Sequence, residues 1–353
     1  MTAPMTVDTL GVVDALRSAP EQLVAAHEAA ARVVAGIDLP DPGDIDHIVF
    51  AGMGGSGIVG DLVAAVGAAS VPAPIVVVKQ YRLPAFVGPR SLVFAVSCSG
   101  DTEETVGLAR DAAAFGARLV TIAGGGALEA LGRAQGFLHF PVTTDLPGPR
   151  FGLGAMVAPA VVTLFKTGLL PDAHAGLVRA QEQVARRRDE CVPEVEGTRN
   201  PARELARRID RTIPLVYGQG SLGAVAALRW KQSVNENAKA PAFWNQYPEL
   251  DHNEVCGWGQ HGDVTRQVVT LVELEHGVED ARLADRARAT RELVEECVAG
   301  VLTVEARGEG GLAQVLDLIH VGDWTSVYLA LAQDVDPGPI DAITQLKAAL
   351  REA

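Results

Sequence analysis

Residues 47–57 read HIVFAGMGGSG, and residues 215–223 read LVYGQGSLG. Each run begins with apolar residues over the length of a strand, passes through a Gly-x-Gly turn with a serine, and continues into residues that can form a helix. Apolar strands that alternate with helices are typical of parallel sheets covered on both faces. The repeated pattern therefore predicts an α/β chain with two similar domains of the doubly wound kind, each a mainly parallel sheet flanked by helices.

The rest of the chain fits this plan. We expect helices and strands at the following places: amphipathic helices over 8–34, strands near 74–78, 92–96, 118–123, 268–273 and 301–305, and helices over 155–168, 175–191 and 201–209. A Pro- and Gly-rich linker covers 141–154, and a last helix begins near Pro339. The resulting division is an N-terminal domain over 1–150, a helical connection over 151–200 and a C-terminal domain over 201–353.

The composition narrows the class of protein. A chain of 353 residues is long enough for two domains, and its hydrophobic content of 48% is enough for a large core. The net charge of −14 argues against nucleic acid or an anionic membrane as a partner, because both need a basic face. We expect neither a signal peptide nor a membrane-spanning segment. The four cysteines form no CxxC pair and the eight histidines lack metal-ligand spacing. These features predict a soluble, cytoplasmic protein without a metal site.

Two glycine- and hydroxyl-rich turns predict a phosphate site. Gly54, Gly55 and Ser56 place backbone N–H groups at a helix N-terminus, which favours an anion. The turn SCSGDTEET at 97–105 adds four hydroxyls, those of Ser97, Ser99, Thr102 and Thr105. Ordinary helix capping accounts for one of these hydroxyls but hardly for four. A hydroxyl cluster without a lysine suits a phosphomonoester carried by a larger molecule.

A dinucleotide site is the alternative for the first turn. Gly52, Gly54 and Gly57 match G-x-G-x-x-G, but Lys79 and Gln80 follow the next strand where an acidic residue is needed. The Gly-Lys-Ser/Thr of a P-loop is also missing. We therefore expect no nucleotide cofactor.

The stretch from Trp230 to Trp258, WKQSVNENAKAPAFWNQYPELDHNEVCGW, concentrates polar, acidic and aromatic residues with little periodicity after Pro241. Local rules that fail together usually mark a functional site. We expect Glu236 in the last turn of a helix over 221–240, where the helix dipole disfavours its charged form and makes it a usable general base. A solvated glutamate beside Lys239 is the alternative.

His252 is the second candidate in this stretch. Asp251 and Glu254 have the spacing of a capping box, with Asp251 as the N-cap, and this leaves the imidazole free to act or simply to pack.

Two cations complete the candidate set. Ile340, Ile343, Leu346 and Leu350 have the spacing of a buried helical stripe, and Lys347 falls within it. Lysine is rarely buried without a partner, so it reaches either into a site or, by snorkelling, to solvent. Arg150, in the linker PGPRFG, can serve as a cation beside developing negative charge.

With these residues collected, the chain resembles the bifunctional phosphoglucose/phosphomannose isomerases, which are built from sugar isomerase (SIS) domains. The resemblance covers nearly the whole chain and rests on GMGGSG at 52–57, SxSGxTxET at 97–105, NENAKAP at 235–241 and PExxHNE at 248–254. The first two motifs alone indicate a SIS domain that binds a sugar phosphate. The last two are far more restrictive.

The resemblance implies roles for single residues. The family's base matches Glu236, its ring-opening histidine His252, its C-terminal lysine Lys347 and its arginine Arg150. It also implies metal-free isomerisation of hexose 6-phosphates through a cis-enediolate, in a homodimer where His252 reaches into the partner's site. Family members often carry Thr between the two prolines where this chain has Gly338, which we expect to enlarge the space around C1 and C2 of the sugar.

Two other classes remain as alternatives. A regulatory SIS protein would bind a sugar phosphate without converting it, and the presence of Glu236 and His252 counts against this. A dinucleotide-dependent oxidoreductase is disfavoured by the missing acidic residue.

Overall fold

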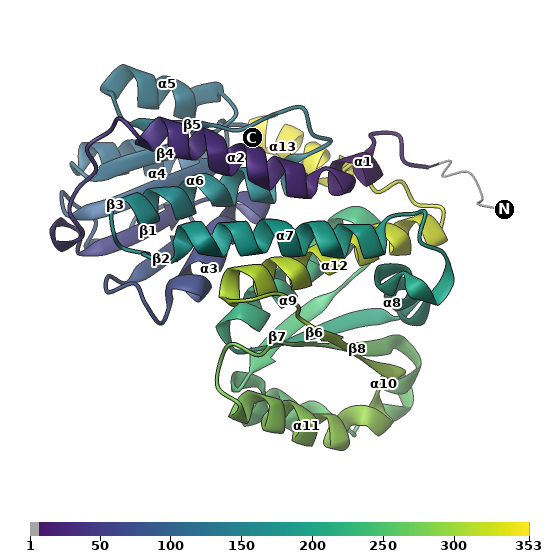
Figure 1. Ribbon diagram of the computed structural model, residues 1–353. Helices are drawn as coiled ribbons and strands as arrows, with labels where there is room; N and C mark the ends of the chain where they lie inside the picture. The colour runs from purple at the N-terminus through teal and green to yellow at the C-terminus, as the bar shows by residue number, and fades with distance from the viewer. Residues whose placement is uncertain (1–6, 353) are drawn as a thin grey trace.

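The computed structural model describes residues 7–352 (Figure 1). The first half of the chain forms a wholly parallel sheet with the strand order β2-β1-β3-β4-β5. Its strands are β1 (His47–Ala51), β2 (Ile75–Val78), β3 (Ser91–Ser97), β4 (Arg118–Ala123) and β5 (Leu138–Pro141). The order reverses between β1 and β3, which is the switch point of a doubly wound sheet.

Alternate residues of each strand pack on opposite faces of this sheet. Ile48 and Phe50 join a core with α2 (Ala19–Val34), α3 (Gly54–Gly67) and α6 (Leu153–Lys166). Val49 and Ala51 instead pack with α4 (Glu103–Ala114) and α5 (Gly126–Gln135). Because both faces are buried, the strands read as continuous apolar runs.

The second half repeats the plan with four parallel strands in the order β7-β6-β8-β9. The strands are β6 (Ile213–Gln219), β7 (Phe243–Tyr247), β8 (Val269–Glu275) and β9 (Gly300–Glu305). Val216 faces α9 (Gly220–Ser233) and α12 (Gly311–Ala332), whereas Tyr217 lies on the face that α11 (Arg282–Val294) covers. The predicted fold class is therefore confirmed. The boundaries at residues 150 and 200 remain a prediction.

Helices between the two sheets join both halves into one continuous core. α7 (Ala173–Cys191) lies along α12 across the middle of the molecule, and α8 (Pro201–Ile209) packs on α12 as well (Figure 1). Trp230 and Trp324 are fully buried there. Short elements complete the chain, namely α1 (Val12–Arg17), α10 (Gly262–Val268), α13 (Asp341–Glu352) and the 3-10 turns Pro42–Asp44, Gly197–Arg199 and Glu295–Cys297.

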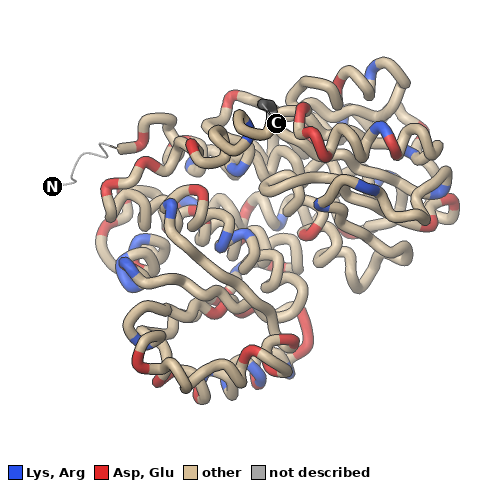
Figure 2. Tube along the Cα trace, turned by 180° about the vertical axis from the view of Figure 1, so that it is seen from behind, with Lys and Arg blue, Asp and Glu red and all other residues tan. Residues whose placement is uncertain are grey.

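α12 has the length and the apolar composition of a membrane-spanning helix, although the sequence led us to expect no such segment. Within residues 7–352 it is the one helix with the required length and composition, but 89% of its apolar window is buried inside the protein. Its apolar side chains are therefore explained by the core. Charged residues of both signs are interspersed along the trace (Figure 2).

Candidate active site

The two predicted phosphate-binding turns meet at the switch point of the first sheet. One follows β1 and the other follows β3, and ligands of doubly wound folds bind where the carboxyl ends of such strands diverge. Gly54 has φ of +52°, a left-handed conformation that suits glycine. The Cys98 N–H donates to Ser56 Oγ at 3.3 Å, which joins the two turns directly.

Three of the four predicted hydroxyls of the second turn lie together. Ser97 Oγ is 2.8 Å from Thr102 Oγ1 and 3.4 Å from Ser99 Oγ. Thr102 is the N-cap residue of α4, yet its side chain makes no capping hydrogen bond, so capping does not explain it. Thr105 is fully buried, and its hydroxyl has no hydrogen-bond partner among the described residues. It does not join the cluster.

Arg150 lies beside the first turn, in the 3-10 turn Pro149–Phe151. A Cβ on Gly55 would stand 3.3 Å from Arg150 Cα, so glycine allows this close approach. The Arg150 side chain is 2% exposed, and its Nη1 lies 3.8 Å from Oε2 of Glu236. Burial is the main cause that lowers the pKa of Arg150, while Glu236 acts in the opposite direction. Arginine stays protonated in proteins, so the site holds a fixed positive charge.

Glu236 lies in a π turn, Val234–Ala238, rather than in the last turn of a long α-helix. α9 ends at Ser233, and Lys239 closes the turn with φ of +55°. The Lys239 ammonium donates to the Glu236 main-chain carbonyl at 2.6 Å, not to its carboxylate. The Glu236 side chain is 24% exposed, and its carboxylate forms an ion pair with Arg150 rather than with Lys239. Single π turns occur frequently at functional sites.

His252 is exposed at the end of the 3-10 turn Glu249–His252. The expected capping box is wrong, because the Asp251 carboxylate accepts from Thr290 Oγ1 at 2.7 Å, whereas Asn253 caps the following 3-10 turn Glu254–Gly257. Within residues 7–352 no hydrogen bond or ion pair joins His252 to another residue of the candidate site. The single chain therefore assembles Arg150 and Glu236 without His252.

The stripe on the last helix is exposed, contrary to the prediction. Ile343, Leu346 and Leu350 of α13 are 38%, 59% and 66% exposed, and Lys347 is exposed as well. Nothing in the described part of the single chain packs over this face, so sequence periodicity alone could not bury it.

Gly338 contacts Arg150 and lies against Leu10, whereas we expected it to leave space for the sugar. Its carbonyl accepts from Arg150 Nη2 at 2.7 Å. A Cβ at this position would stand 2.9 Å from Cβ and Cγ of Leu10. Leu10 therefore occupies the space that the missing side chain was expected to leave open to the sugar.

The similar turn between β6 and α9 in the second sheet is occupied by a side chain of the protein itself, that of Glu279. Glu279, which follows β8, places its carboxylate at the N-terminus of α9 and accepts from the N–H groups of Ser221 at 3.0 Å and Leu222 at 3.2 Å. A Cβ on Gly220 would overlap this carboxylate. In the first turn the Ser56 N–H donates to the Met53 main-chain carbonyl at 3.1 Å, whereas the N–H groups of Gly54 and Gly55 have no hydrogen-bond partner among the described residues.

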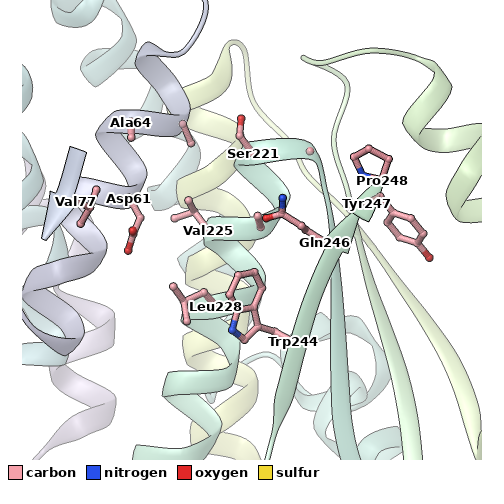
Figure 3. A pocket seen from close by; sticks show the side chains of 13 residues that line it. Asp61, Ala64, Val77, Ser221, Val225, Leu228, Trp244, Gln246, Tyr247 and Pro248 are labelled. Atoms are coloured by element: carbon pink, nitrogen blue, oxygen red, sulfur yellow. The ribbon is translucent and has the colours of Figure 1, made fainter. Parts of the chain in front are cut away.

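A separate pocket of about 440 Å³ lies between α3 and α9. Figure 3 shows Asp61 on one wall and Val225, Leu228 and Trp244 on the other. Its lining is mainly apolar and contains none of the predicted site residues. No group of three or more His, Cys, Asp and Glu side chains that could hold a metal occurs within residues 7–352.

The sequence analysis did not identify Arg229, Asp323 and Ser326, which hydrogen bonds connect to Arg150 and to Asn237, the neighbour of Glu236. Arg229 is 1% exposed and lies in the apolar helix stretch AVAALRW, and Asp323 lies in the apolar α12. Charged residues are rarely buried without a partner. A single charged residue on an otherwise apolar helix therefore predicts a buried partner, and this feature could have pointed to both residues.

Comparison with known proteins first defines the class. The profile described as "Bacterial phospho-glucose isomerase C-terminal SIS domain" matches residues 198–350, which include the whole second sheet. The solved structure of a hypothetical protein from Thermus thermophilus superposes with a TM-score of 0.70 at 18% identity, and the match covers 97% of this chain and 90% of that one. Residues 198–350 thus match a sugar isomerase domain, and the whole chain shares the fold of the solved structure.

Two relatives then identify the family. A bifunctional phosphoglucose/phosphomannose isomerase of Caldicellulosiruptor bescii is 33% identical over 94% of this chain and 97% of its own length. One of Aquifex aeolicus is 34% identical over 86% of this chain and 90% of its own. The chain belongs to the family of bifunctional phosphoglucose/phosphomannose isomerases.

Proposed function

We propose that the protein is an aldose–ketose isomerase that interconverts glucose 6-phosphate and mannose 6-phosphate with fructose 6-phosphate. The observation that carries this proposal is the Glu236 carboxylate, 3.8 Å from the Arg150 guanidinium, beside a turn suited to a phosphate. A base and a fixed cation side by side are what proton abstraction next to a carbonyl requires. The named activity of the relatives supports the same reaction.

The phosphate group is held by the N–H groups of Gly54 and Gly55, by Ser56 and by the hydroxyls of Ser97, Ser99 and Thr102. The Ser56 N–H donates to the Met53 main-chain carbonyl, so Ser56 contributes through its side chain. We leave Thr105, which was predicted with these hydroxyls, out of the proposed set, because its side chain is fully buried and no hydrogen bond joins it to the other three within the described residues. Glu236 then removes the proton from C2 of the aldose and returns it to C1. The resulting enediolate carries negative charge, and Arg150 Nη1, which has no hydrogen-bond partner within residues 7–352, is available to donate to it.

Ring opening requires a second proton-transfer group, and we propose His252, assisted by Lys347, in a homodimer. Both side chains are exposed in the single chain, and the apolar face of α13 is uncovered. A partner subunit that brings His252 to the site and covers α13 accounts for both observations. We also propose a cytoplasmic location, which fits four cysteines without disulfides.

Product analysis with fructose 6-phosphate tests the proposal. Purified protein is expected to form both aldose phosphates, as followed by NMR. Glu236→Gln is nearly isosteric and should keep binding while turnover falls at least ~100-fold. Binding of fructose 6-phosphate without any turnover by the wild type would favour the non-catalytic alternative. Turnover of Glu236→Gln within a few-fold of wild type would refute the role of Glu236.

Mixed dimers test the shared site. His252→Ala and Glu236→Gln subunits, each inactive, should partly restore activity when they are refolded together, since one site of the heterodimer has both groups. Confirmed heterodimers without activity would place His252 in its own subunit's site or outside catalysis.

A further inference from the structure

Five buried residues are joined in a closed ring of hydrogen bonds, two of which end on main-chain carbonyls. Of these five residues, only Arg150 belongs to the predicted site. The members of the ring are Arg150, Arg229, Asp323, Ser326 and Asn237. Arg229 Nη2 donates to the Arg150 main-chain carbonyl at 2.6 Å, and Arg229 Nε donates to Asp323 Oδ1 at 3.1 Å. Ser326 Oγ donates to the Asp323 carbonyl at 2.7 Å and accepts from Asn237 Nδ2 at 2.9 Å. Asn237 Oδ1 accepts from Arg150 Nε at 2.7 Å, which closes the ring.

The ring is buried at every position. Arg150, Arg229, Asp323, Asn237 and Ser326 are at most 6% exposed. Buried charge-assisted hydrogen bonds are short and strong, and the loss of one partner leaves the other charge without compensation. The arrangement is therefore rigid compared with an exposed ion pair.

The ring connects the separate parts of the candidate site. It fixes Arg150 at both ends, through its carbonyl and through its guanidinium. Asn237 is adjacent to Glu236 in the π turn, so the same hydrogen bonds fix the backbone that carries the carboxylate. Arg229 Nη1 lies 3.6 Å from where a Cβ on Gly55 would stand, and it has no hydrogen-bond partner among the described residues. Its charge lies next to the turn proposed for the phosphate.

We propose that Arg229 is a positioning residue for the isomerisation: through Arg150 and the ring it holds the cation and the carboxylate of Glu236 at their working separation beside the phosphate-binding turn. This inference rests on the proposed function. Catalytic groups that are displaced by about 1 Å can lose roughly 100-fold in rate. Disruption of the ring should therefore lower kcat more than it weakens substrate binding.

Arg229→Lys is the test variant, since it keeps the charge but cannot donate to Arg150 and Asp323 in the fork geometry of a guanidinium. The matched control is Arg187→Lys. Arg187 pairs with Asp317 of the same helix α12 through two hydrogen bonds of 2.6 and 2.8 Å, and the two side chains are 3% and 0% exposed. This control loses an equally buried arginine–aspartate pair that has no part in the ring.

The measurements are kcat and KM for fructose 6-phosphate at a temperature where both variants are folded. Arg229→Lys should lower kcat by roughly 10-fold to 100-fold with KM changed less than about threefold. Arg187→Lys should lower the melting temperature and leave kcat within about twofold of wild type. Ser326→Ala, which cuts the ring without changing a charge, should lower kcat in the same direction.

Equal kcat values for Arg229→Lys and Arg187→Lys would overturn the inference. A wild type without isomerase activity would instead refute the proposed function, and amide hydrogen exchange then decides the inference separately. Exchange over residues 234–239 should be faster in Arg229→Lys than in Arg187→Lys if the ring fixes the π turn. Identical exchange in the two variants would overturn the positioning role.

Discussion

The turn before α9 resembles the proposed phosphate turn before α3, but the carboxylate of Glu279 occupies it. The contribution of this carboxylate to stability can be measured directly. Glu279 accepts from the N–H groups of Ser221 and Leu222 and from the Ser221 hydroxyl. Its side chain is 25% exposed. Glu279→Gln keeps the size and one acceptor oxygen but removes the charge.

The expected cost follows from these contacts. Hydrogen bonds to a charged acceptor contribute about 1 kcal/mol more than neutral ones, and a partly buried carboxylate at a helix N-terminus adds up to about 1 kcal/mol. We therefore expect Glu279→Gln to lower the free energy of unfolding by about 1–2 kcal/mol at pH 7.

Urea unfolding followed by tryptophan fluorescence measures this difference. Glu305→Gln is the control, because Glu305 lies exposed on β9 and makes no side-chain hydrogen bond or ion pair in the described part of the chain. The control should shift stability by less than about 0.5 kcal/mol. If the two variants lose the same stability, the Glu279 carboxylate does not stabilise this turn.

Three further outcomes are expected. Ser99→Ala and Thr102→Val should each weaken binding of fructose 6-phosphate by about 1 kcal/mol in calorimetry, since each removes a hydrogen bond to a charged group; equal affinity of the wild type for fructose and its phosphate would refute this. Burial lowers the pKa of His320 to about 3, so the unfolded state binds more protons below pH 6.5 and stability is lost as the pH falls. Between pH 7 and pH 5 this loss is about 2 kcal/mol, and it should disappear in His320→Gln, whose amide oxygen can still accept from Trp324; an unchanged pH dependence would contradict the assignment. EDTA should leave the isomerase rate unchanged, and inactivation that zinc reverses would overturn the proposed mechanism.

Local sequence features were sufficient to predict most of the fold. Buried parallel strands are apolar throughout, and glycine-rich turns follow β1 and β6 directly, so β1, β3, β4 and β6 and the helices after β1 and β6 could be located without three-dimensional information. The helix α5 after β4 and the short strand β5 were not predicted. The same argument located the phosphate turns, because the carboxyl ends of β1 and β3 meet at the switch point.

Strand β7 was missed because it lies at an edge. Its residues FWNQY alternate poorly, and Phe243 is 58% exposed, so the stretch lacks the periodicity on which strand prediction depends. It forms because β6 has an edge with which β7 pairs in parallel. This pairing depends on residues distant in the sequence, so local patterns do not predict it.

Parts of the candidate site could be predicted only where the type of a single residue and its sequence neighbours indicate a role. Arg150 and Glu236 were found from their types and neighbours, but Arg229 and Asp323 are 94 residues apart and meet only after α9 and α12 pack. The capping prediction at Asp251 failed for the same reason, since Thr290 of α11 donates to its carboxylate. Competing long-range partners cannot be read from local spacing.

The proposal that Glu236 moves a proton through an enediolate is tested most directly by deuterium incorporation. Fructose 6-phosphate is incubated with the protein in D₂O, and the products are analysed by NMR after many turnovers. The Glu236 side chain is 24% exposed, so its carboxylic acid can exchange its proton with solvent. Deuterium should therefore accumulate at C2 of both glucose 6-phosphate and mannose 6-phosphate, and Glu236→Gln should abolish this incorporation. Conversion at the normal rate without deuterium in either product would indicate hydride transfer and would contradict the account.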